Sequence, residues 1–293
     1  MLKMFKFIKR YYFILSLIIF SCSSGLEKED YKNAVILETI ALPKIINETS
    51  GLEILNNQFI THNDSGGEPS LYFFSQNGEI INSITLEEES FWEIYNSDWE
   101  DITADEDYIY IADTGNNFGN RDNLNIIKVK TTDFSIDSKI DISYKDQQTF
   151  LPRPKHKYDA EALFLIEDKI AVLSKDRDNL FTDLYLIDKE SNSKQVLESK
   201  ITYNVNSLIT GGDYNKDMSL LALVSYNSKG SQFLILFEDF NLETLAEKKF
   251  RKFKIPLERA QIEAIKIIDD KTFWITSEDE GIGSPYMYKI KVE

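Results

Sequence analysis

The amino-acid sequence predicts an all-β protein, a β-propeller of five four-stranded blades. Three observations predict this fold: many short apolar runs separated by polar turns, an internal repeat of about 50 residues, and a spare strand at the opposite end of the chain from an incomplete last repeat. A sixth blade fits into the longest interval between repeats, so the sequence allows either five or six blades. A β-sandwich would not explain the regular period.

The predicted strands are short apolar runs bounded by clusters of Asn, Asp, Gly and Ser. Examples are LYFF (71–74), YIYIAD (108–113), LYLI (184–187) and FLILF (233–237). Runs of this length and composition are typical of β-strands. The best helix candidate is the single segment ESFWEIYN (89–96). Strands should therefore make up nearly all of the regular structure.

Each repeat opens with a small or acidic residue that comes two positions before an apolar or aromatic one. The five openings lie 50, 61, 51 and 51 residues apart: Ser50-Gly51-Leu52, Glu100-Asp101-Ile102, Glu161-Ala162-Leu163, Gly212-Asp213-Tyr214 and Glu263-Ala264-Ile265. A second strand and a polar loop follow each opening, and a third strand follows the loop. A fourth strand follows in the first four repeats, at INSITL (81–86), KIDIS (139–143), QVLES (195–199) and KKFRKFKI (248–255).

The fifth repeat ends with the chain at Glu293, before a fourth strand could form. The unassigned run AVILETIAL (34–42) precedes the first repeat and supplies the missing strand. Propellers close their ring in this way, which removes open sheet edges. We therefore assign residues 34–293 to a single propeller domain.

Residues 1–21 have the pattern of a signal peptide, with four basic residues up to Arg10 and an apolar run at 13–20. That run is too short to span a bilayer, which needs about 20 residues. The end of the segment resembles the bacterial lipoprotein box, since Ile19, Ser21 and Cys22 match it, although Phe20 is bulkier than the usual residue. An ordinary secretory signal followed by a chance cysteine is the alternative.

The lipoprotein resemblance implies that lipid on Cys22 anchors the protein to a membrane and that residues 22–33 form a tether. It implies location in the cell envelope of a Gram-negative bacterium, and we expect the outer membrane. Removal of residues 1–21 takes away four positive charges and changes the net charge from −16 to about −20. This charge excludes a nucleic-acid partner, which needs Lys and Arg clusters. We expect a monomer.

The propeller topology predicts where function lies, because the repeat openings and the loops after the second strands share one face. Glu100, Glu161 and Glu263 should ring the mouth of the channel, where they are candidate catalytic groups and metal ligands. The surrounding loops add candidate ligand-binding residues, namely His62, Asp64, Asp101, Asp113, Asn116, Asp159, Lys175 and Glu278. Crowded carboxylates repel one another, so a bound cation, a raised pKa or nearby bases must offset the cost. The nearby bases are Arg121, Arg153, Lys155, His156, Lys175 and Arg177.

The chemistry of these residues favours a hard cation. Two histidines are too few for a multi-histidine zinc site, whereas carboxylate and amide oxygens suit Ca²⁺. The sequence contains no nucleophile elbow, phosphate-binding glycine loop or dinucleotide fingerprint. Hydrolysis by two carboxylates stays open, with Glu161 and Glu263 as the pair. A purely structural role, in which each acid caps backbone N–H groups, also stays open.

The motifs HNDSGG (62–67), DWEDI (98–102), YIADTGNN (110–117), YDAEAL (158–163) and QIEAI (261–265) together resemble those of a group of bacterial secreted and lipoprotein propellers. More distantly, the chain resembles the SdiA-regulated periplasmic propellers and the esterase-like or phytase-like propeller repeats. The resemblance implies a propeller with an acidic, calcium-binding top face and implies no particular enzyme activity. We therefore expect a lipid-anchored protein that binds a small molecule, glycan or protein on this face. The alternative is a hydrolase of glycosidic or phosphoester bonds.

Overall fold

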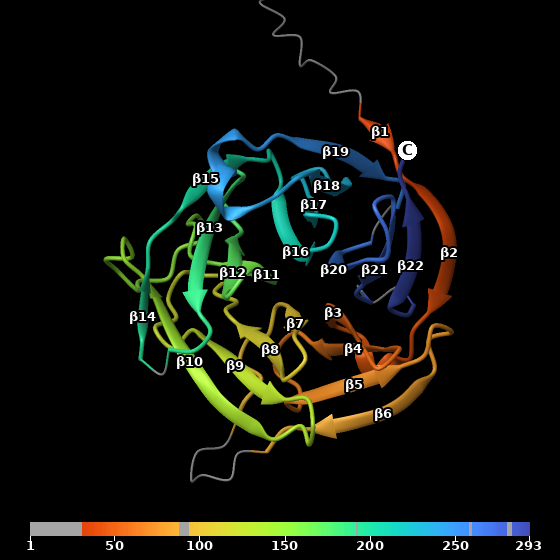
Figure 1. Ribbon diagram of the computed structural model, residues 1–293, viewed down its shortest axis with the longest axis horizontal. Coiled ribbons are helices and arrows are strands. Elements are labelled where there is room, and N and C mark those ends of the chain that lie inside the picture. Colours follow the sequence, from red (N-terminus) through yellow and green to blue (C-terminus); the bar gives the residue numbers. More distant parts are fainter. Residues whose placement is uncertain (1–30, 88–93, 192, 258–259, 280–282) are drawn as a thin grey trace, which may run out of the picture. The chain divides into compact units, whose positions relative to one another are not determined.

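The computed structural model describes residues 31–87, 94–191, 193–257, 260–279 and 283–293. All of them belong to one unit, Tyr31–Glu293. Their strands form five sheets that stand around a common axis (Figure 1). The prediction of an all-β propeller is therefore confirmed, with five blades. The 61-residue interval between two repeat openings holds two long loops, 114–124 and 145–159, and this fully described stretch adds no sixth blade.

The first three blades run in chain order from the axis outward (Figure 1). Blade 1 consists of β3 (Thr49–Leu55), β4 (Gln58–Asn63), β5 (Ser70–Phe74) and β6 (Ile80–Thr85). Blade 2 consists of β7 (Ile102–Ala104), β8 (Tyr108–Asp113), β9 (Asn125–Lys130) and β10 (Ile136–Tyr144). Blade 3 consists of β11 (Ala160–Ile166), β12 (Lys169–Ser174), β13 (Phe181–Asp188) and β15 (Ile201–Asn204).

The last two blades complete the ring. Blade 4 consists of β16 (Leu208–Asn215), β17 (Leu220–Tyr226), β18 (Gln232–Phe237) and β19 (Phe250–Ile255). Blade 5 consists of β20 (Ile262–Ile267), β21 (Thr272–Ser277), β22 (Tyr286–Lys291) and the N-terminal β2 (Val35–Ala41). Strand β2 pairs antiparallel with β22, from Val35 opposite Lys291 to Ala41 opposite Tyr286. The predicted closure by an N-terminal strand is therefore confirmed.

The outer strand of blade 3 differs from the prediction. The segment QVLES was expected there, but β14 (Gln195–Leu197) pairs in parallel with β10 of blade 2. The outer strand of blade 3 is β15, four residues further along. A similar parallel strand, β1 (Lys32–Asn33), lies outside β19 of blade 4. Each extra strand covers backbone groups that an open sheet edge would expose.

The hydrophobic core lies between neighbouring blades. Ile126 of blade 2 belongs to the same buried cluster as Val172 of blade 3, and Val224 of blade 4 belongs to one cluster with Ile275 of blade 5. Fully burying an aliphatic side chain stabilises the fold by about 1.5–3 kcal/mol. Each blade packs against a neighbour on both of its faces, so the strands become stable when the ring closes.

Carboxylates beside the innermost strands also join the blades near the axis. Asp101 Oδ2 accepts hydrogen bonds from Leu163 N at 2.8 Å and from Gly212 N at 3.2 Å, which links blades 2, 3 and 4. Asp213 Oδ2 accepts one from Ile267 N at 2.8 Å, which links blades 4 and 5. The Asp101 carboxylate, predicted to bind a ligand, thus lies against backbone N–H groups inside the ring.

Helical structure is limited to two short 3₁₀ turns in the described residues, η1 (Lys44–Ile46) and η2 (Leu242–Glu247). The helix candidate 89–96 falls mainly on residues 88–93, which lie outside the described residues, as do the predicted signal peptide 1–21, Cys22 and the tether up to residue 30. None of the helices in the described part is long and apolar enough to cross a membrane.

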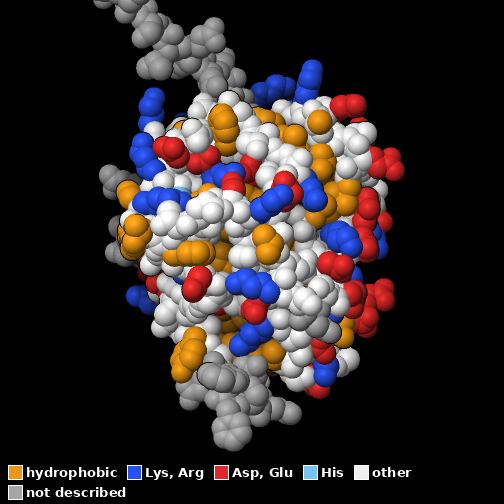
Figure 2. Space-filling view, turned by 90° about the vertical axis from the view of Figure 1, so that its left-hand side faces the viewer, with side chains coloured by type: hydrophobic (Ala, Val, Ile, Leu, Met, Phe, Trp, Pro, Cys, Tyr) orange, Lys and Arg blue, Asp and Glu red, His pale blue; other side chains and the backbone are white. Residues whose placement is uncertain are grey.

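The outer wall around β10 and β14 carries side chains of every kind. Figure 2 shows Lys and Arg, Asp and Glu, and hydrophobic side chains interspersed over this wall, with acidic side chains gathered along the right-hand edge of the view. The net charge of −16 is therefore not confined to the channel mouth.

Candidate functional site

A β-bulge at the start of the innermost strand places an acid at the channel mouth in two blades. In blade 3 the register of β11 against β12 shifts by one residue at Glu161, and in blade 5 the register of β20 against β21 shifts at Glu263. A bulge leaves one residue outside the ladder and redirects its side chain, as happens often beside functional sites. The recurring Glu of the sequence repeat is thus the bulged residue.

Blades 2 and 4 vary this arrangement. In blade 2 both Glu100 and Asp101 face Ala112, because Glu100 N donates to Ala112 O and Ala112 N donates to Asp101 O, each at 2.9 Å. In blade 4 the shift falls at Thr210, two residues before the Gly212 that the repeat predicted. The Thr210 hydroxyl donates to the backbone oxygen of Ile262 at 2.6 Å. Blades 2, 3 and 5 therefore supply carboxylates, whereas blade 4 supplies the Thr210 hydroxyl, which already donates a hydrogen bond to the backbone.

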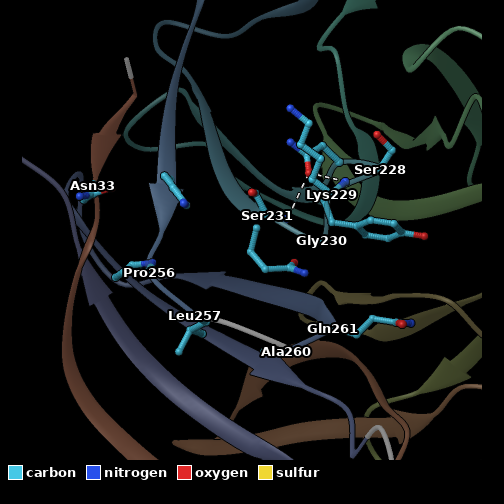
Figure 3. A pocket seen from close by; sticks show the side chains of 13 residues that line it. Asn33, Ser228, Lys229, Gly230, Ser231, Pro256, Leu257, Ala260 and Gln261 are labelled. Carbon is cyan, nitrogen blue, oxygen red and sulfur yellow. Dashed lines mark hydrogen bonds between the residues drawn. The ribbon is translucent and has the colours of Figure 1, made fainter. Parts of the chain in front are cut away.

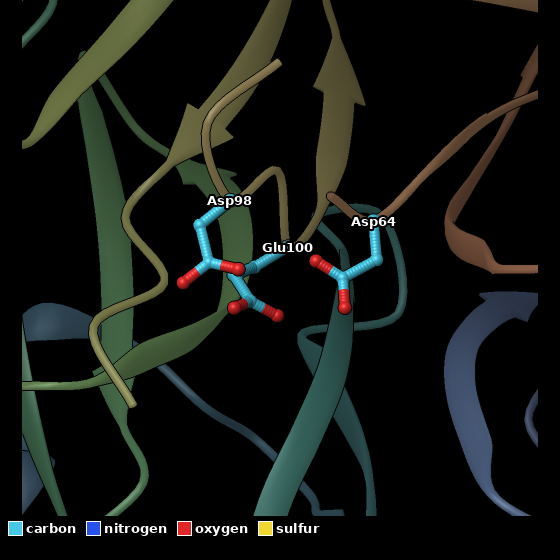
Figure 4. A group of neighbouring side chains, drawn as sticks. All are labelled: Asp64, Asp98 and Glu100. Atoms are coloured by element: carbon cyan, nitrogen blue, oxygen red, sulfur yellow. The ribbon is translucent and has the colours of Figure 1, made fainter. Parts of the chain in front are cut away.

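Three carboxylates from blades 1 and 2 meet at one point. Asp64 follows β4 directly, and Asp98 and Glu100 precede β7. One carboxylate oxygen from each lies within 4.8 Å of the other two, and the three groups point toward one another (Figure 4). We call these three residues the open triad. Asp98 was not among the predicted site residues.

A second triad shares Glu100 and continues into blade 3. It consists of Glu100, Asp159 and Glu161, whose oxygens also lie within 4.8 Å of one another, and all three side chains are buried. We call it the paired triad, because two of its three carboxylates form ion pairs with cations. Arg177 donates to Asp159 Oδ2 from Nε at 3.0 Å and from a terminal nitrogen at 2.7 Å, and Lys175 donates to Glu161.

The open triad is compensated less directly, by the charge of Arg121, which opposes the rise in the pKa of Asp98. Among the residues that the structure describes, no Lys or Arg forms an ion pair with Asp64, Asp98 or Glu100. Burial raises the pKa of Asp64 to about 8, and the neighbouring Asp98 adds to the rise. Burial also raises the pKa of Glu100 well above its usual range, with further contributions from Glu161 and Asp64. Without a cation, this cluster retains protons at neutral pH.

Glu263 and Glu278 approach the cluster from blade 5. Burial raises the pKa of Glu263 to about 7 and that of Glu278 to about 9, and Glu263 adds to the rise at Glu278. Glu263 is 4% exposed, and its Oε1 atom is buried without a hydrogen-bond partner. It belongs to neither triad, although its charge raises the pKa of Asp64 and of Glu161. The three repeat acids therefore act on one another electrostatically, but only Glu100 and Glu161 share a possible ligand set.

Several predicted site residues hold the loops in place. Asp113 pairs with Arg121 at 2.8 Å. Asn116 donates from its side chain to the backbone oxygen of Tyr158 at 2.9 Å and from its backbone N to Asp159 Oδ1 at 2.7 Å. These contacts position the paired triad.

His62, the other predicted residue of blade 1, is fully buried, and its ring lies edge-on to Trp99 at 5.5 Å between centroids. Burial lowers the pKa of His62 to about 4, so its imidazole is neutral at neutral pH. The ring packs against Trp99 and belongs to neither triad.

Asp98 and Arg177 complete the site beyond the predicted residues. Asp98 lies two positions before Glu100, as Asp159 lies two positions before Glu161, so a repeated Asp-x-Glu spacing was the signal that could have found it. Arg177 was recognised as a nearby base but not as a site residue. Its loop position carries no repeated pattern, so its contact with Asp159 follows only from the folded loop.

Comparison with known proteins bears on the fold alone. No protein-family model matches the sequence, and a search of curated proteins finds no match. Among solved structures, the chain is similar to the Pan2 WD40 domain of Neurospora crassa, with 10% identity, 89% of this chain and 96% of that chain covered, and a TM-score of 0.42. A hypothetical protein from Leishmania major matches with 9% identity, coverage of 88% and 91%, and a TM-score of 0.48. A Thermus thermophilus protein described as a glucose dehydrogenase matches with 8% identity, coverage of 86% and 99%, and a TM-score of 0.48.

Proposed function

We propose that this protein is a ligand-binding propeller of the bacterial cell envelope whose channel mouth holds a divalent cation, with Ca²⁺ as the best match. The observation that carries the proposal is the open triad, in which three carboxylates converge without a basic partner in the described residues. Such a cluster is costly unless protons or a cation neutralise it. In the paired triad beside it, by contrast, Lys175 and Arg177 form ion pairs with Glu161 and Asp159.

The donor atoms of the open triad support a hard cation. All three donors are carboxylate oxygens, and Ca²⁺ takes six to eight oxygen ligands at about 2.3–2.6 Å. Asp64 Oδ1 is buried and has no hydrogen-bond partner, as expected of an atom that faces a cation. The fully buried imidazole of His62 stands outside the triad, so the set lacks the nitrogen or sulfur ligands that zinc favours. When bound, the cation would supply positive charge and open coordination positions for an anionic or hydroxylated ligand.

Calorimetric titration of the full chain with CaCl₂ tests the cation. We expect one binding event that the substitution Glu100→Gln weakens at least about tenfold, because Glu100 is the residue common to both triads. The control is Glu79→Gln, which changes an exposed glutamate in the turn before β6. If the full chain binds no Ca²⁺, or if both variants bind it like the unchanged protein, the cation site does not exist.

The place of action rests on the N-terminal sequence. The basic segment, the apolar run and Cys22 support lipid anchoring in the cell envelope. We expect the Cys22→Ser variant, expressed in a Gram-negative host, to move from the membrane fraction to the soluble fraction. A variant that stays with the membranes, in an assay where a known lipoprotein variant is released, would rule out the anchor.

A second candidate function, hydrolysis of a glycosidic or phosphoester bond, is favoured by Glu263. A carboxyl group with a pKa near 7 and an unpartnered oxygen suits general acid catalysis at neutral pH. The test is hydrolysis of p-nitrophenyl glycosides and phosphates by the full chain and by Glu263→Gln. Loss of at least about a hundredfold in the variant would support catalysis. Equal rates in the two proteins would leave binding as the function.

A further inference from the structure

A cavity of about 750 Å³ lies between blades 4 and 5. It is bounded by the β17–β18 loop on one side and by Pro256, Leu257, Ala260 and Gln261 on the other (Figure 3). This volume falls within the range of small-molecule pockets. We call it the side groove. Two of its lining residues contact residues beside the triads. The ammonium of Lys175, which pairs with Glu161, lies 5.2 Å from the Tyr226 ring centroid, and Gln261 O accepts a hydrogen bond from Glu278 N at 3.1 Å.

The side groove contains a polar group that lacks a partner. Gln232, at the first position of β18, is 4% exposed, and its Oε1 atom is buried without a hydrogen bond. A buried amide oxygen left unpaired costs roughly 1–3 kcal/mol. Gln232 lines the side groove, and the terminal torsion of a Gln side chain is broad. A ligand hydroxyl would satisfy it there.

The loop beside Gln232 is held in one shape before any ligand arrives. Asn227 Oδ1 accepts hydrogen bonds from Lys229 N at 3.0 Å and from Ser231 N at 3.1 Å. Gly230 has a φ of +76°, a conformation that glycine adopts without strain. A loop fixed in this way loses little conformational entropy when a ligand binds.

The described lining of the side groove is positively charged, opposite to the net charge of the protein. Its described lining contains two lysines, Lys229 and Lys254, and no Asp or Glu, although the chain carries a net charge of −16. The rest of the lining is rich in amides and hydroxyls, which both donate and accept hydrogen bonds. Tyr226 adds an aromatic ring that can cover an apolar face of a ligand.

We infer that the side groove binds an acidic saccharide, a sugar that carries a carboxylate. Amide and hydroxyl side chains match the hydroxyl edge of a sugar, the Tyr226 ring matches its C–H face, and the two lysines match its carboxylate. The unpaired amide of Gln232 gives this ligand a buried hydrogen bond. The inference goes beyond the cation site and does not depend on it, because none of these groups belongs to either triad.

Calorimetric titration of the full chain in EDTA tests the inference, with α-1,4-digalacturonic acid and its neutral counterpart α-1,4-galactobiose as probes. We expect the acidic disaccharide to bind at least about tenfold more tightly than the neutral one. Gln232→Leu keeps the size of the side chain and should weaken both ligands about tenfold. The double variant Lys229→Gln with Lys254→Gln should abolish the preference for the acidic sugar.

The control is Lys216→Gln, an exposed lysine in the β16–β17 turn, which should change neither affinity. Thermal unfolding of each variant shows whether it is folded, and the lysine variants test the groove even if Gln232→Leu is unstable. Absence of binding at millimolar concentration, equal affinity for the two sugars, or binding unaffected by either set of variants would overturn the inference. Because EDTA removes divalent cations, failure of the cation site leaves these results unchanged.

Discussion

Gly115 lies directly against the carboxylate of Glu100. A Cβ atom built on Gly115 would fall 2.0 Å from Glu100 Oε1 and 2.4 Å from the carboxyl carbon of Asp98. Real Cβ atoms do not come this close to other atoms. The lack of a side chain at Gly115 therefore leaves the space that the carboxylates of Glu100 and Asp98 occupy.

Gly115→Ala should displace both carboxylates, because the added methyl group needs the space that they occupy. We expect a loss of about 1–3 kcal/mol in unfolding free energy, typical of overpacking, and at least about tenfold weaker Ca²⁺ binding. Urea unfolding and calorimetry measure the two effects. Gly67→Ala is the matched control, since a Cβ at Gly67 meets nothing within 4 Å. Normal Ca²⁺ affinity in Gly115→Ala would place the cation elsewhere.

The metal-free protein should lose stability as the pH rises. The pKa values of Asp64, Glu263 and Glu278 are raised from about 4 to about 8, 7 and 9, so the folded state holds protons that the unfolded state releases. This stabilisation is fully present below the unfolded pKa near 4 and is lost as the pH rises through the folded values. Urea unfolding in EDTA between pH 5 and pH 9 should show a falling free energy, with a shallower fall in Asp64→Asn. A free energy that rises over this range contradicts the raised pKa values.

The protein should lose less stability when both Lys175 and Glu161 are replaced than when Lys175 alone is replaced. Both side chains are buried, and their mutual attraction offsets the loss of water. Lys175→Met leaves the buried Glu161 with only the 3.4 Å contact to Arg177, and it should cost about 3–5 kcal/mol. Lys175→Met combined with Glu161→Gln should recover much of that loss in a double-mutant cycle of urea unfolding. Additive effects would show that the two groups do not interact.

Asp101→Ala should weaken the ring, since the carboxylate accepts backbone hydrogen bonds from blades 3 and 4. Unpaired buried N–H groups cost roughly 1–3 kcal/mol each, so we expect a loss of several kcal/mol in urea unfolding. Asp217→Asn, at an exposed aspartate between β16 and β17, serves as the control and should change stability by less than about 0.5 kcal/mol. Unchanged stability in Asp101→Ala would mean that the ring does not need these bonds.

The sequence was sufficient to predict the blade period and the closing strand, because both follow from local apolar patterns and the length of the repeat. It was not sufficient for the outer edges of the blades. QVLES reads as a strand wherever it pairs, and only the folded chain shows that β14 joins blade 2 rather than blade 3. The opening at Gly212 was also misplaced by two residues, because Thr210 and the two glycines after it lack the acid that marks the bulges of blades 2, 3 and 5.

The sequence was sufficient to predict some residues of the site but not how they are grouped. Glu100 and Glu161 could be found because the same bulge recurs in several blades. The division into an open and a paired triad could not, because it depends on where Lys175 and Arg177 reach across their loop. The bond between Asp101 and Gly212 joins residues 111 positions apart, so no local pattern separates this structural carboxylate from a ligand-binding one.

The path of the N-terminal segment into the ring decides which strand resists a pulling force first. Residues 32–33 lie against β19 of blade 4 as the short strand β1, and the next strand, β2, crosses to blade 5 and closes the circle. Tension applied at the N-terminus therefore acts first on the two-residue strand β1, before it reaches the seven-residue strand β2. The pairing of β1 with β19 must therefore break before the force reaches the strand that closes the ring.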